Sequence, residues 1–206
     1  MSQSMRGLQG QGRVQAVELE DGTRIDCDMV ILGIGVVPNA ELAHAAGLAV
    51  GNGIEVDMLG RTSAPQVLAI GDVASVAQST TLGASARLRL ESIQAANDGA
   101  KAAASLLVAR EQPCTAVPWF WSDQFHLKFQ MAGLPAPGDE VVLRGDMSTD
   151  RFSLFYLRAG ALVAAHSVNR PGEHMLSRKL IGARARLGAD QLADESFDLK
   201  TALAAA

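Results

Sequence analysis

Cysteine is scarce in this sequence, and its two residues form no motif. Cys27 and Cys114 lie far apart and no C-x-x-C pair occurs, so the chain cannot build a zinc site or a dithiol redox centre from its own thiols. The four histidines are also scattered, with no acidic residue at the spacing of metal ligands. We therefore expect structural thiols, ordinary histidines and no metal site.

Neither sign of charge is in large excess, and long hydrophobic runs are missing. Eighteen basic and 22 acidic residues leave a formal net charge of −4, which argues against general binding to nucleic acid or to an anionic membrane. No apolar stretch approaches the roughly 20 residues of a membrane span, and residues 1–12 are too polar and glycine-rich for a signal peptide. Since 48% of the residues are hydrophobic, we expect a globular protein, and the cytoplasm as its location.

A dinucleotide-binding fingerprint, G-x-G-x-x-G, is missing as well. Gly33 and Gly35 follow the apolar run Met29–Leu32, as the first two glycines should, but Pro38 occupies the third position. A true fingerprint needs a small residue there for close helix packing, and an acid about 20 residues later. The sequence therefore predicts a strand over 28–35 that enters a glycine loop, without a cradle for a pyrophosphate.

The segment 61–72 combines residue types that fit together at a bound cofactor. Val67–Ile70 is a short apolar run, typical of a strand that is buried on both faces of a mostly parallel sheet. Gly71 lets the backbone approach a ligand, and Asp72 places a carboxylate where α/β sheets bind nucleotides. Because a carboxylate repels phosphate, we expect Asp72 to accept a hydrogen bond from a ribityl or ribose hydroxyl.

At these residues the sequence resembles the flavoprotein reductases with two dinucleotide-binding domains. Their second flavin motif is Thr, six residues, Ala, any residue, Gly and Asp, and the chain matches it in full at Thr62, Ala69, Gly71 and Asp72. Within this pyridine-nucleotide-disulfide oxidoreductase superfamily, the chain most resembles the ferredoxin reductases of bacterial oxygenase systems, of the putidaredoxin and rubredoxin reductase type. The other markers of the resemblance are Gly33–Asn39, Arg89–Ile93, Pro118–Gln124 and Val168–Pro171.

The resemblance implies FAD and NADH as the cofactors of the complete protein. It assigns the flavin to Gly71 and Asp72, and to the start of a helix that the apolar spacing predicts over 91–110. In that first turn, free N–H groups and the helix dipole would stabilise negative charge on the reduced flavin. The residues concerned are Glu91, Ser92 and Ile93, although Ile93 could also be a plain core residue.

Two further cofactor contacts follow from the resemblance alone. Ile34 and Gly35 would pass near the nicotinamide, although a plain Gly-Pro turn remains open for that loop. Trp121 would lie next to the isoalloxazine ring and shield it from solvent, or it could be only an interface residue. No residue of the chain is assigned a catalytic role.

The predicted fold class is α/β plus α+β, in three regions. Residues 1–60 are expected to be the tail of an NAD-binding domain with a three-strand meander, and residues 61–112 the carboxyl-terminal part of an FAD-binding domain with a returning parallel strand. Residues 113–206 are expected to form an antiparallel α+β reductase domain. Strands are expected over 13–19, 23–26, 53–57, 124–131, 140–144, 152–158 and 161–168, a loop over 73–86, and helices over 41–46 and 173–186, the last ended by Gly188.

The expected function is that of part of an FAD-dependent NAD(P)H:ferredoxin oxidoreductase, which passes electrons from NADH through FAD to the iron–sulfur ferredoxin of an oxygenase system. Both fingerprints of the family are missing, so the chain is expected to be the carboxyl-terminal half and inactive alone; whether it is an enzyme stays open. One alternative is a non-catalytic interaction or dimerisation module. A disulfide reductase is disfavoured, because neither His166 nor His174 is followed by the proline of the His-Pro pair in those enzymes.

Basic residues gather close to the carboxyl end of the chain. On a helix over 173–186 they could form an exposed basic face opposite the leucines. Such a face could dock an acidic ferredoxin, or it could be a solvated face with cations at the favourable end of the helix dipole. The residues proposed for docking are Arg178, Lys179, Arg184 and Arg186.

Overall fold

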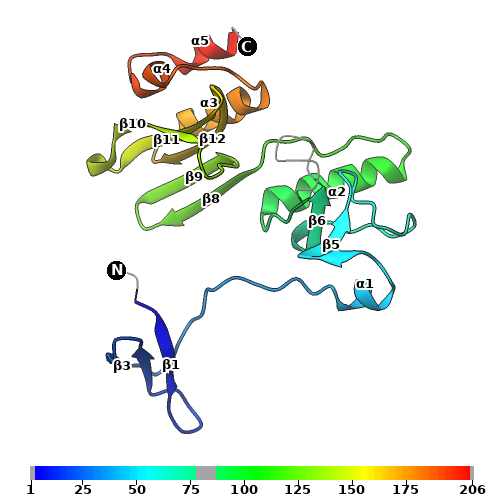
Figure 1. Ribbon diagram of the computed structural model, residues 1–206, viewed down its shortest axis with the longest axis vertical. Coiled ribbons are helices and arrows are strands. Elements are labelled where there is room, and N and C mark those ends of the chain that lie inside the picture. The colour runs from blue at the N-terminus through cyan, green and yellow to red at the C-terminus, as the bar shows by residue number, and fades with distance from the viewer. Residues whose placement is uncertain (1–2, 78–86, 205–206) are drawn as a thin grey trace. The chain divides into compact units, whose positions relative to one another are not determined.

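The computed structural model of the chain describes residues 3–77 and 87–204, in two compact units, Met1–Val37 and Pro38–Ala206. The first unit contains β1 (Met5–Gln9), β2 (Ala16–Leu19) and β3 (Arg24–Asp26). The second contains α1 (Glu41–Ala45), β4 (Val50–Gly51), β5 (Gly53–Val56), the 3-10 turn η1 (Gly71–Val73), β6 (Ala74–Ala77), β7 (Arg87–Leu88), α2 (Ile93–Leu107), β8 (Trp119–Gln124), β9 (Leu127–Gly133), β10 (Glu140–Asp146), η2 (Met147–Thr149), β11 (Arg151–Arg158), β12 (Ala161–Val168), α3 (Pro171–Gly182), α4 (Ala189–Ala193) and α5 (Leu199–Ala204) (Figure 1). Across these described ranges, no helix is long and apolar enough to cross a membrane.

The first unit is an antiparallel meander in the order β1-β2-β3. The predicted hairpin between β2 and β3 is confirmed, because Gly22 turns the chain with φ 84° and donates its N–H to the carbonyl oxygen of Leu19 at 3.0 Å. The strand β1 was not predicted, since its residues are polar and glycine-rich. It pairs with β2 through an irregular register near Met5 and Gly7.

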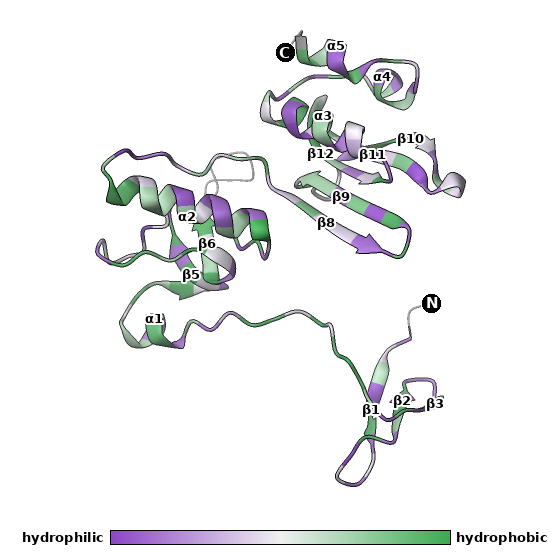
Figure 2. Ribbon diagram, turned by 180° about the vertical axis from the view of Figure 1, so that it is seen from behind, coloured by the Kyte–Doolittle hydropathy of each residue, from purple (hydrophilic) through white to green (hydrophobic). Residues whose placement is uncertain are grey.

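The apolar run after the meander is not a strand, so the strand predicted over 28–35 is wrong. The run lies in an extended segment outside any sheet, and its side chains are exposed, Met29 by 75% and Ile31 by 87%. Figure 2 shows much of this segment in the hydrophobic colour. A strand needs neighbours that pair with its backbone and cover its side chains, and no other described strand pairs with these residues.

The second unit begins with α1 and a small mixed sheet in the order β4-β5-β6-β7. The helix α1 was predicted, and Gly47 follows it with φ 73° as expected. The predicted strand over Gly53–Val56 is confirmed as β5, and it runs parallel to β6, with Ile54 opposite Ala74.

The parallel partner of β5 lies later in the chain than the sequence predicted. Val67–Ile70 is not a strand, because Thr62 closes a turn by donating its hydroxyl to the carbonyl oxygen of Val67 at 2.9 Å. The strand is Ala74–Ala77, within the region that was predicted to be a loop; the remainder of that loop, residues 78–86, lies outside the described residues. Asp72 therefore precedes a strand instead of following one.

The helix predicted over 91–110 is confirmed as α2. Ser92 caps its amino end, where the hydroxyl oxygen accepts the N–H of Ala95 at 3.1 Å. Ala102 and Ala103 are its buried residues. Gly99 of α2 lies against Ile70, where a Cβ would be in ordinary van der Waals contact, 3.6 Å from the Cβ of Ile70.

The carboxyl-terminal part is a five-stranded antiparallel sheet in the order β10-β11-β12-β9-β8. Figure 1 shows α3, α4 and α5 on one side of it. The predicted hairpin is confirmed as β11 and β12, and the expected strand 140–144 as part of β10.

The strand predicted over 124–131 is interrupted, because Phe125 adopts a positive φ of 56° in the turn between β8 and β9, with its ring fully exposed. The core between sheet and helices includes Phe155, Leu157, Leu162, Leu180, Leu192 and Leu199.

The helix α3 ends four residues before the predicted terminus. Ala185 donates its N–H to the carbonyl oxygen of Leu180 at 2.9 Å, and Arg184 has a positive φ of 53°, so the chain leaves the helix after Gly182. Arg186 then forms an isolated bridge to Ala161, at the start of the central strand β12. The continuous basic helical face predicted for Arg178, Lys179, Arg184 and Arg186 is therefore wrong, since the last two lie beyond α3. Gly188 does not end α3 but caps α4.

Candidate functional site

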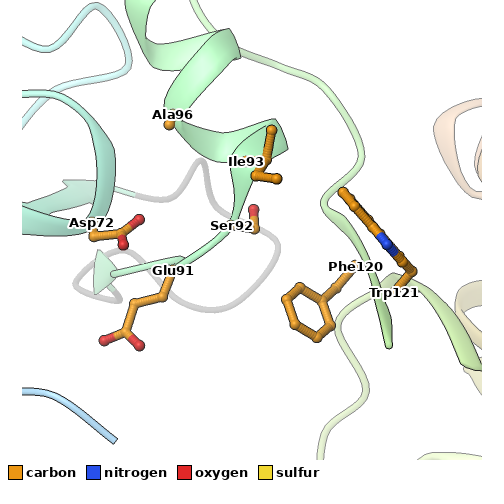
Figure 3. Close-up of a pocket in the computed structure, with 7 residues that line it drawn as sticks. All are labelled: Asp72, Glu91, Ser92, Ile93, Ala96, Phe120 and Trp121. Carbon is orange, nitrogen blue, oxygen red and sulfur yellow. The ribbon is translucent and has the colours of Figure 1, made fainter. Parts of the chain in front are cut away.

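One cavity of about 510 Å³ brings together three separate segments of the second unit. These are the turn before β6, the first turn of α2, and the strand β8. Figure 3 shows the side chains around it, with Asp72 on one side and Trp121 on the other. The lining residues are Asp72, Glu91, Ser92, Ile93, Ala96, Phe120 and Trp121.

Asp72 is presented to this cavity by Arg89, whose side chain is 10% exposed. Arg89 donates to the carbonyl oxygen of Asp72 at 3.0 Å and to the side-chain oxygen of Asn52 at 3.2 Å. The preceding residue, Gly71, has a positive φ of 72°, which a residue with a Cβ rarely adopts. Within the described part of the chain, the Asp72 carboxylate has no hydrogen-bond or ion-pair partner, so both of its oxygens can accept bonds from a ligand.

The first turn of α2 supplies hydrogen-bond donors. The first N–H groups of a helix have no partner within it, and the Ser92 hydroxyl accepts only that of Ala95. The N–H groups of Ile93 and Gln94 therefore remain for a ligand. The Glu91 carboxylate pairs with Arg89 and points away from the cavity in Figure 3, so its side chain is engaged elsewhere.

Aromatic rings from β8 form the opposite wall. The rings of Trp119 and Trp121 stack with centroids 5.3 Å apart and planes at 26°. Phe120 points to the other face of the strand, is 43% exposed, and lies 6.4 Å from Trp121 between ring centroids. Arg178 of α3 covers Trp119, with its guanidinium carbon 4.5 Å from the ring centroid. The cavity thus has one apolar wall and one wall with a free carboxylate and free N–H groups.

Comparison with known proteins identifies the chain. The family profile described as pyridine nucleotide-disulphide oxidoreductase matches residues 1–100, and the profile described as Reductase C-terminal matches residues 119–203. The chain belongs to the pyridine nucleotide-disulphide oxidoreductase family. This confirms the resemblance found in the sequence motifs, including the likeness to ferredoxin reductases.

Curated relatives and solved structures agree within this family. The ferredoxin reductase subunit of 5,5'-dehydrodivanillate O-demethylase from Sphingobium sp. strain SYK-6 is 44% identical over 95% of this chain and 47% of its own length. The ferredoxin reductase for the CYP199A2 system of Rhodopseudomonas palustris superposes with a TM-score of 0.90 at 42% identity, over 98% of this chain and 49% of that one. The covalent putidaredoxin reductase–putidaredoxin complex gives 0.92 at 39%, over 99% and 49%. The chain therefore spans about half the length of the relatives that it matches.

The structure brings most of the residues predicted from the family motifs to one place. Asp72, Glu91, Ser92, Ile93 and Trp121 line the same cavity, while Gly71 adjoins Asp72 and lines a second cavity. Their roles toward a cofactor remain predictions. The other two predicted contacts, Ile34 and Gly35, belong to the amino-terminal unit, which is described by itself, so their approach to a nicotinamide also remains a prediction.

Sequence analysis missed three residues of this site. Phe120 and Ala96 line the cavity, and Arg89 holds the backbone of Asp72. The position of Ala96 on the first turns of α2 was a usable signal, because it follows Ser92 and Ile93 at helical spacing. Arg89 gave no comparable signal, since its role depends on a contact across 17 residues.

Proposed function

We propose that the chain is part of an FAD-dependent NAD(P)H:ferredoxin oxidoreductase, which passes electrons from NADH through FAD to the iron–sulfur ferredoxin of an oxygenase system. One observation carries the proposal: the free carboxylate of Asp72, the free N–H groups at the start of α2 and the indole of Trp121 all face one cavity. The relatives support it, because they are named as ferredoxin reductases. Since the chain spans about half their length, the activity of the whole protein is part of the proposal.

The residues of the cavity fit a flavin. The Asp72 carboxylate is suited to a ribityl hydroxyl, which can donate to it, and unsuited to a phosphate, which it would repel. The N–H groups of Ile93 and Gln94 are suited to the anionic edge of a reduced ring. Trp121 and Phe120 offer apolar surface that would exclude water from the ring. When bound, FAD supplies the conversion between a two-electron hydride and single electrons for an iron–sulfur cluster.

Replacement of Asp72 tests this assignment. In the complete protein, assembled with the amino-terminal half that carries the G-x-G-x-x-G fingerprints, Asp72→Ala should weaken FAD binding tenfold or more. The reason is the loss of one hydrogen bond to a charged acceptor, worth about 1.5 to 3 kcal/mol. Asp190→Ala is a matched control, because Asp190 is exposed on α4, outside the cavity.

Flavin affinity, measured by titration, gives the decision. Equal affinity in Asp72→Ala and in the parent protein would remove Asp72 from the flavin site. If the assembled protein itself bound no flavin, the chain would be better described as a non-catalytic interaction or dimerisation module of the same family.

We further propose that the partner ferredoxin docks at the exposed side of α3. Lys179 is exposed on this helix, and Arg178 lies over Trp119, which stacks on Trp121 at the cavity. Arg178 and Lys179 form no ion pair with any described residue, so both charges are available to an acidic partner. Arg184 and Arg186 are exposed just beyond α3, where they add positive charge. Electrostatic steering suits weak, fast encounters of this kind.

Charge reversal on α3 tests the docking surface. Arg178→Glu combined with Lys179→Glu should raise the KM for ferredoxin several-fold at low salt and flatten its dependence on ionic strength. Reduction of ferricyanide by NADH should not change in Lys179→Glu alone, which leaves Arg178 over Trp119. The control is Arg110→Glu with Arg151→Glu, which changes the net charge equally at two exposed residues. Equal ferredoxin kinetics in the α3 variant and in this control would rule out docking at α3.

A further inference from the structure

We propose that Gln94 is a positioning residue, which fixes β8 to α2 and thereby holds Trp121 in the wall of the cavity. The two walls of the cavity belong to segments that are distant in the chain, with Ile93 on α2 and Trp121 on β8. Gln94 directly follows Ile93, and its side chain reaches the first residue of β8. The inference uses the proposed function only to name the occupant of the cavity.

Three hydrogen bonds define the role of the Gln94 amide. Its Oε1 accepts the backbone N–H of Trp119 at 2.8 Å. Its Nε2 donates to Oδ2 of Asp98 at 2.7 Å and to the carbonyl oxygen of Val117 at 3.4 Å. An ionised carboxylate only accepts hydrogen bonds, so Asp98 fixes which end of the amide faces it and therefore aims Oε1 at Trp119.

The N–H of Trp119 depends on this contact. Among the described strands, β8 pairs with β9 alone and is an edge strand, so alternate N–H groups point away from the sheet. Pro118 precedes Trp119 and has no N–H of its own. Among the side-chain hydrogen bonds of the described residues, only those of Gln94 join α2 to the start of β8.

The attachment at Trp119 is transmitted to Trp121 through the stacked rings. Both residues point to the same face of β8, and their centroids lie 5.3 Å apart. Arg178 covers the Trp119 ring, which keeps the pair in place on the side of α3. Gln94 and Asp98 also line the second cavity, of about 490 Å³.

Selective labelling makes the test specific, because the chain contains two tryptophans. Protein labelled with ¹⁵N-tryptophan gives one backbone and one indole signal for each, without any bound cofactor. In Gln94→Leu, hydrogen exchange of the Trp119 amide should be about fivefold faster, as expected for the loss of one ordinary hydrogen bond. The indole signal of Trp121 should shift or broaden. Gln112→Leu, on the exposed linker, is the control and should leave both signals unchanged.

A charge-swapped pair distinguishes positioning from simple packing. Gln94→Glu alone places two carboxylates in contact and should loosen the Trp119 amide as Gln94→Leu does. Adding Asp98→Asn supplies a donor to the new carboxylate, so the double variant should restore both signals. If Gln94→Leu does not fold, as judged by circular dichroism, the single and double charge variants carry the test alone.

Two results would overturn the proposal. One is an unchanged Trp119 amide in the Gln94 variants. The other is a faster Trp119 amide with an unchanged Trp121 indole signal, which would make Gln94 a local cap without influence on the cavity wall. Both readouts are independent of flavin, so a failure here is distinguishable from a failure of the proposed function.

Discussion

At the scale of single residues, His174 is the most unusual buried group. Its side chain is 2% exposed, its ring lies 5.8 Å from that of Trp119, and neither ring nitrogen has a partner among the described residues. Burial, and to a smaller extent the positive charge of Arg178, together lower the pKa of His174 from 6.5 to about 4. The imidazole is therefore neutral at neutral pH, as a buried base without a counter-ion must be.

His174 should make folding sensitive to moderate acid. Its folded pKa lies below the unfolded value, so the unfolded chain binds a proton between pH 6.5 and about 4 and the folded chain does not. The free energy of unfolding should therefore fall by about 3 kcal/mol as the pH is lowered through this window. Urea denaturation at pH 7 and pH 4.5 measures the effect, and His174→Leu should remove most of it.

The control for this prediction is His44→Leu, because His44 is exposed on α1. Burial also lowers the pKa of His166, which hydrogen-bonds to Tyr156, so a smaller slope should remain in His174→Leu. The prediction would be wrong if His174→Leu and the parent protein lost equal stability between the two pH values.

At the scale of elements, a single arginine attaches the last part of the chain to the sheet. Arg144 on β10 is 5% exposed and forms an ion pair with Glu173 at the start of α3, at 3.0 Å. Its guanidinium also donates to four backbone carbonyl oxygens at the end of α4 and in the loop after it, those of Leu192, Asp194, Glu195 and Phe197. These carbonyl oxygens lie at a helix end and in a loop, where regular secondary structure offers them no N–H partner, and the Arg144 guanidinium supplies the donors instead.

Arg144→Leu should loosen α4 and α5 while the sheet remains folded. The change leaves backbone carbonyl oxygens without a donor, while Glu173 keeps its contacts with Arg170 and Ser153, so the cost should be about 1 to 3 kcal/mol. Hydrogen exchange should accelerate first in residues 189–204. Arg151→Leu, at an exposed arginine on the neighbouring strand β11, is the control and should change stability by less than about 0.5 kcal/mol. Uniform loss of protection over the whole sheet in Arg144→Leu would contradict the local role.

The success of sequence analysis also differed between elements, for physical reasons. α2 and the β11–β12 hairpin were predictable because helix spacing, a capping serine and the Ala159-Gly160 turn are local signals. The strands predicted at two apolar runs, Met29–Leu32 and Val67–Ile70, were wrong. A short apolar run becomes a strand only where another strand pairs with it. The end of α3 depended on the bridge between Arg186 and Ala161, a tertiary contact that periodicity does not contain.

The candidate site was predictable to the extent that it depends on short motifs. Asp72 and Ser92 belong to segments whose residue order identifies the family, so their convergence on one cavity could be expected. The contacts that hold those segments together could not, because they join residues far apart in the sequence. Gln94 reaches Trp119 across 25 residues, and Arg89 reaches Asp72 across 17.

At the scale of the whole molecule, two regions of the described chain carry uncovered apolar side chains. The segment after β3 exposes Ile31, Ile34 and Val37, and the second cavity is lined by apolar residues of the β5–β6 sheet and α2. Exposed apolar residues that are neighbours in the chain, unlike single scattered ones, are typical of interaction surfaces.

The last prediction is that the chain alone binds no stoichiometric FAD or NADH. Residues such as Asp72 can hold the ribityl and ring portions of a flavin, but the chain contains no G-x-G-x-x-G loop, whose N–H groups at a helix start would hold the pyrophosphate. The purified 206-residue protein should therefore be colourless. After incubation with FAD and dialysis to remove the unbound FAD, it should show no flavin absorbance. Addition of a polypeptide that carries both fingerprints should restore binding, and Asp72→Ala should weaken that restored binding. A yellow preparation of the chain alone, with one flavin per chain, would show that these residues suffice without a pyrophosphate cradle.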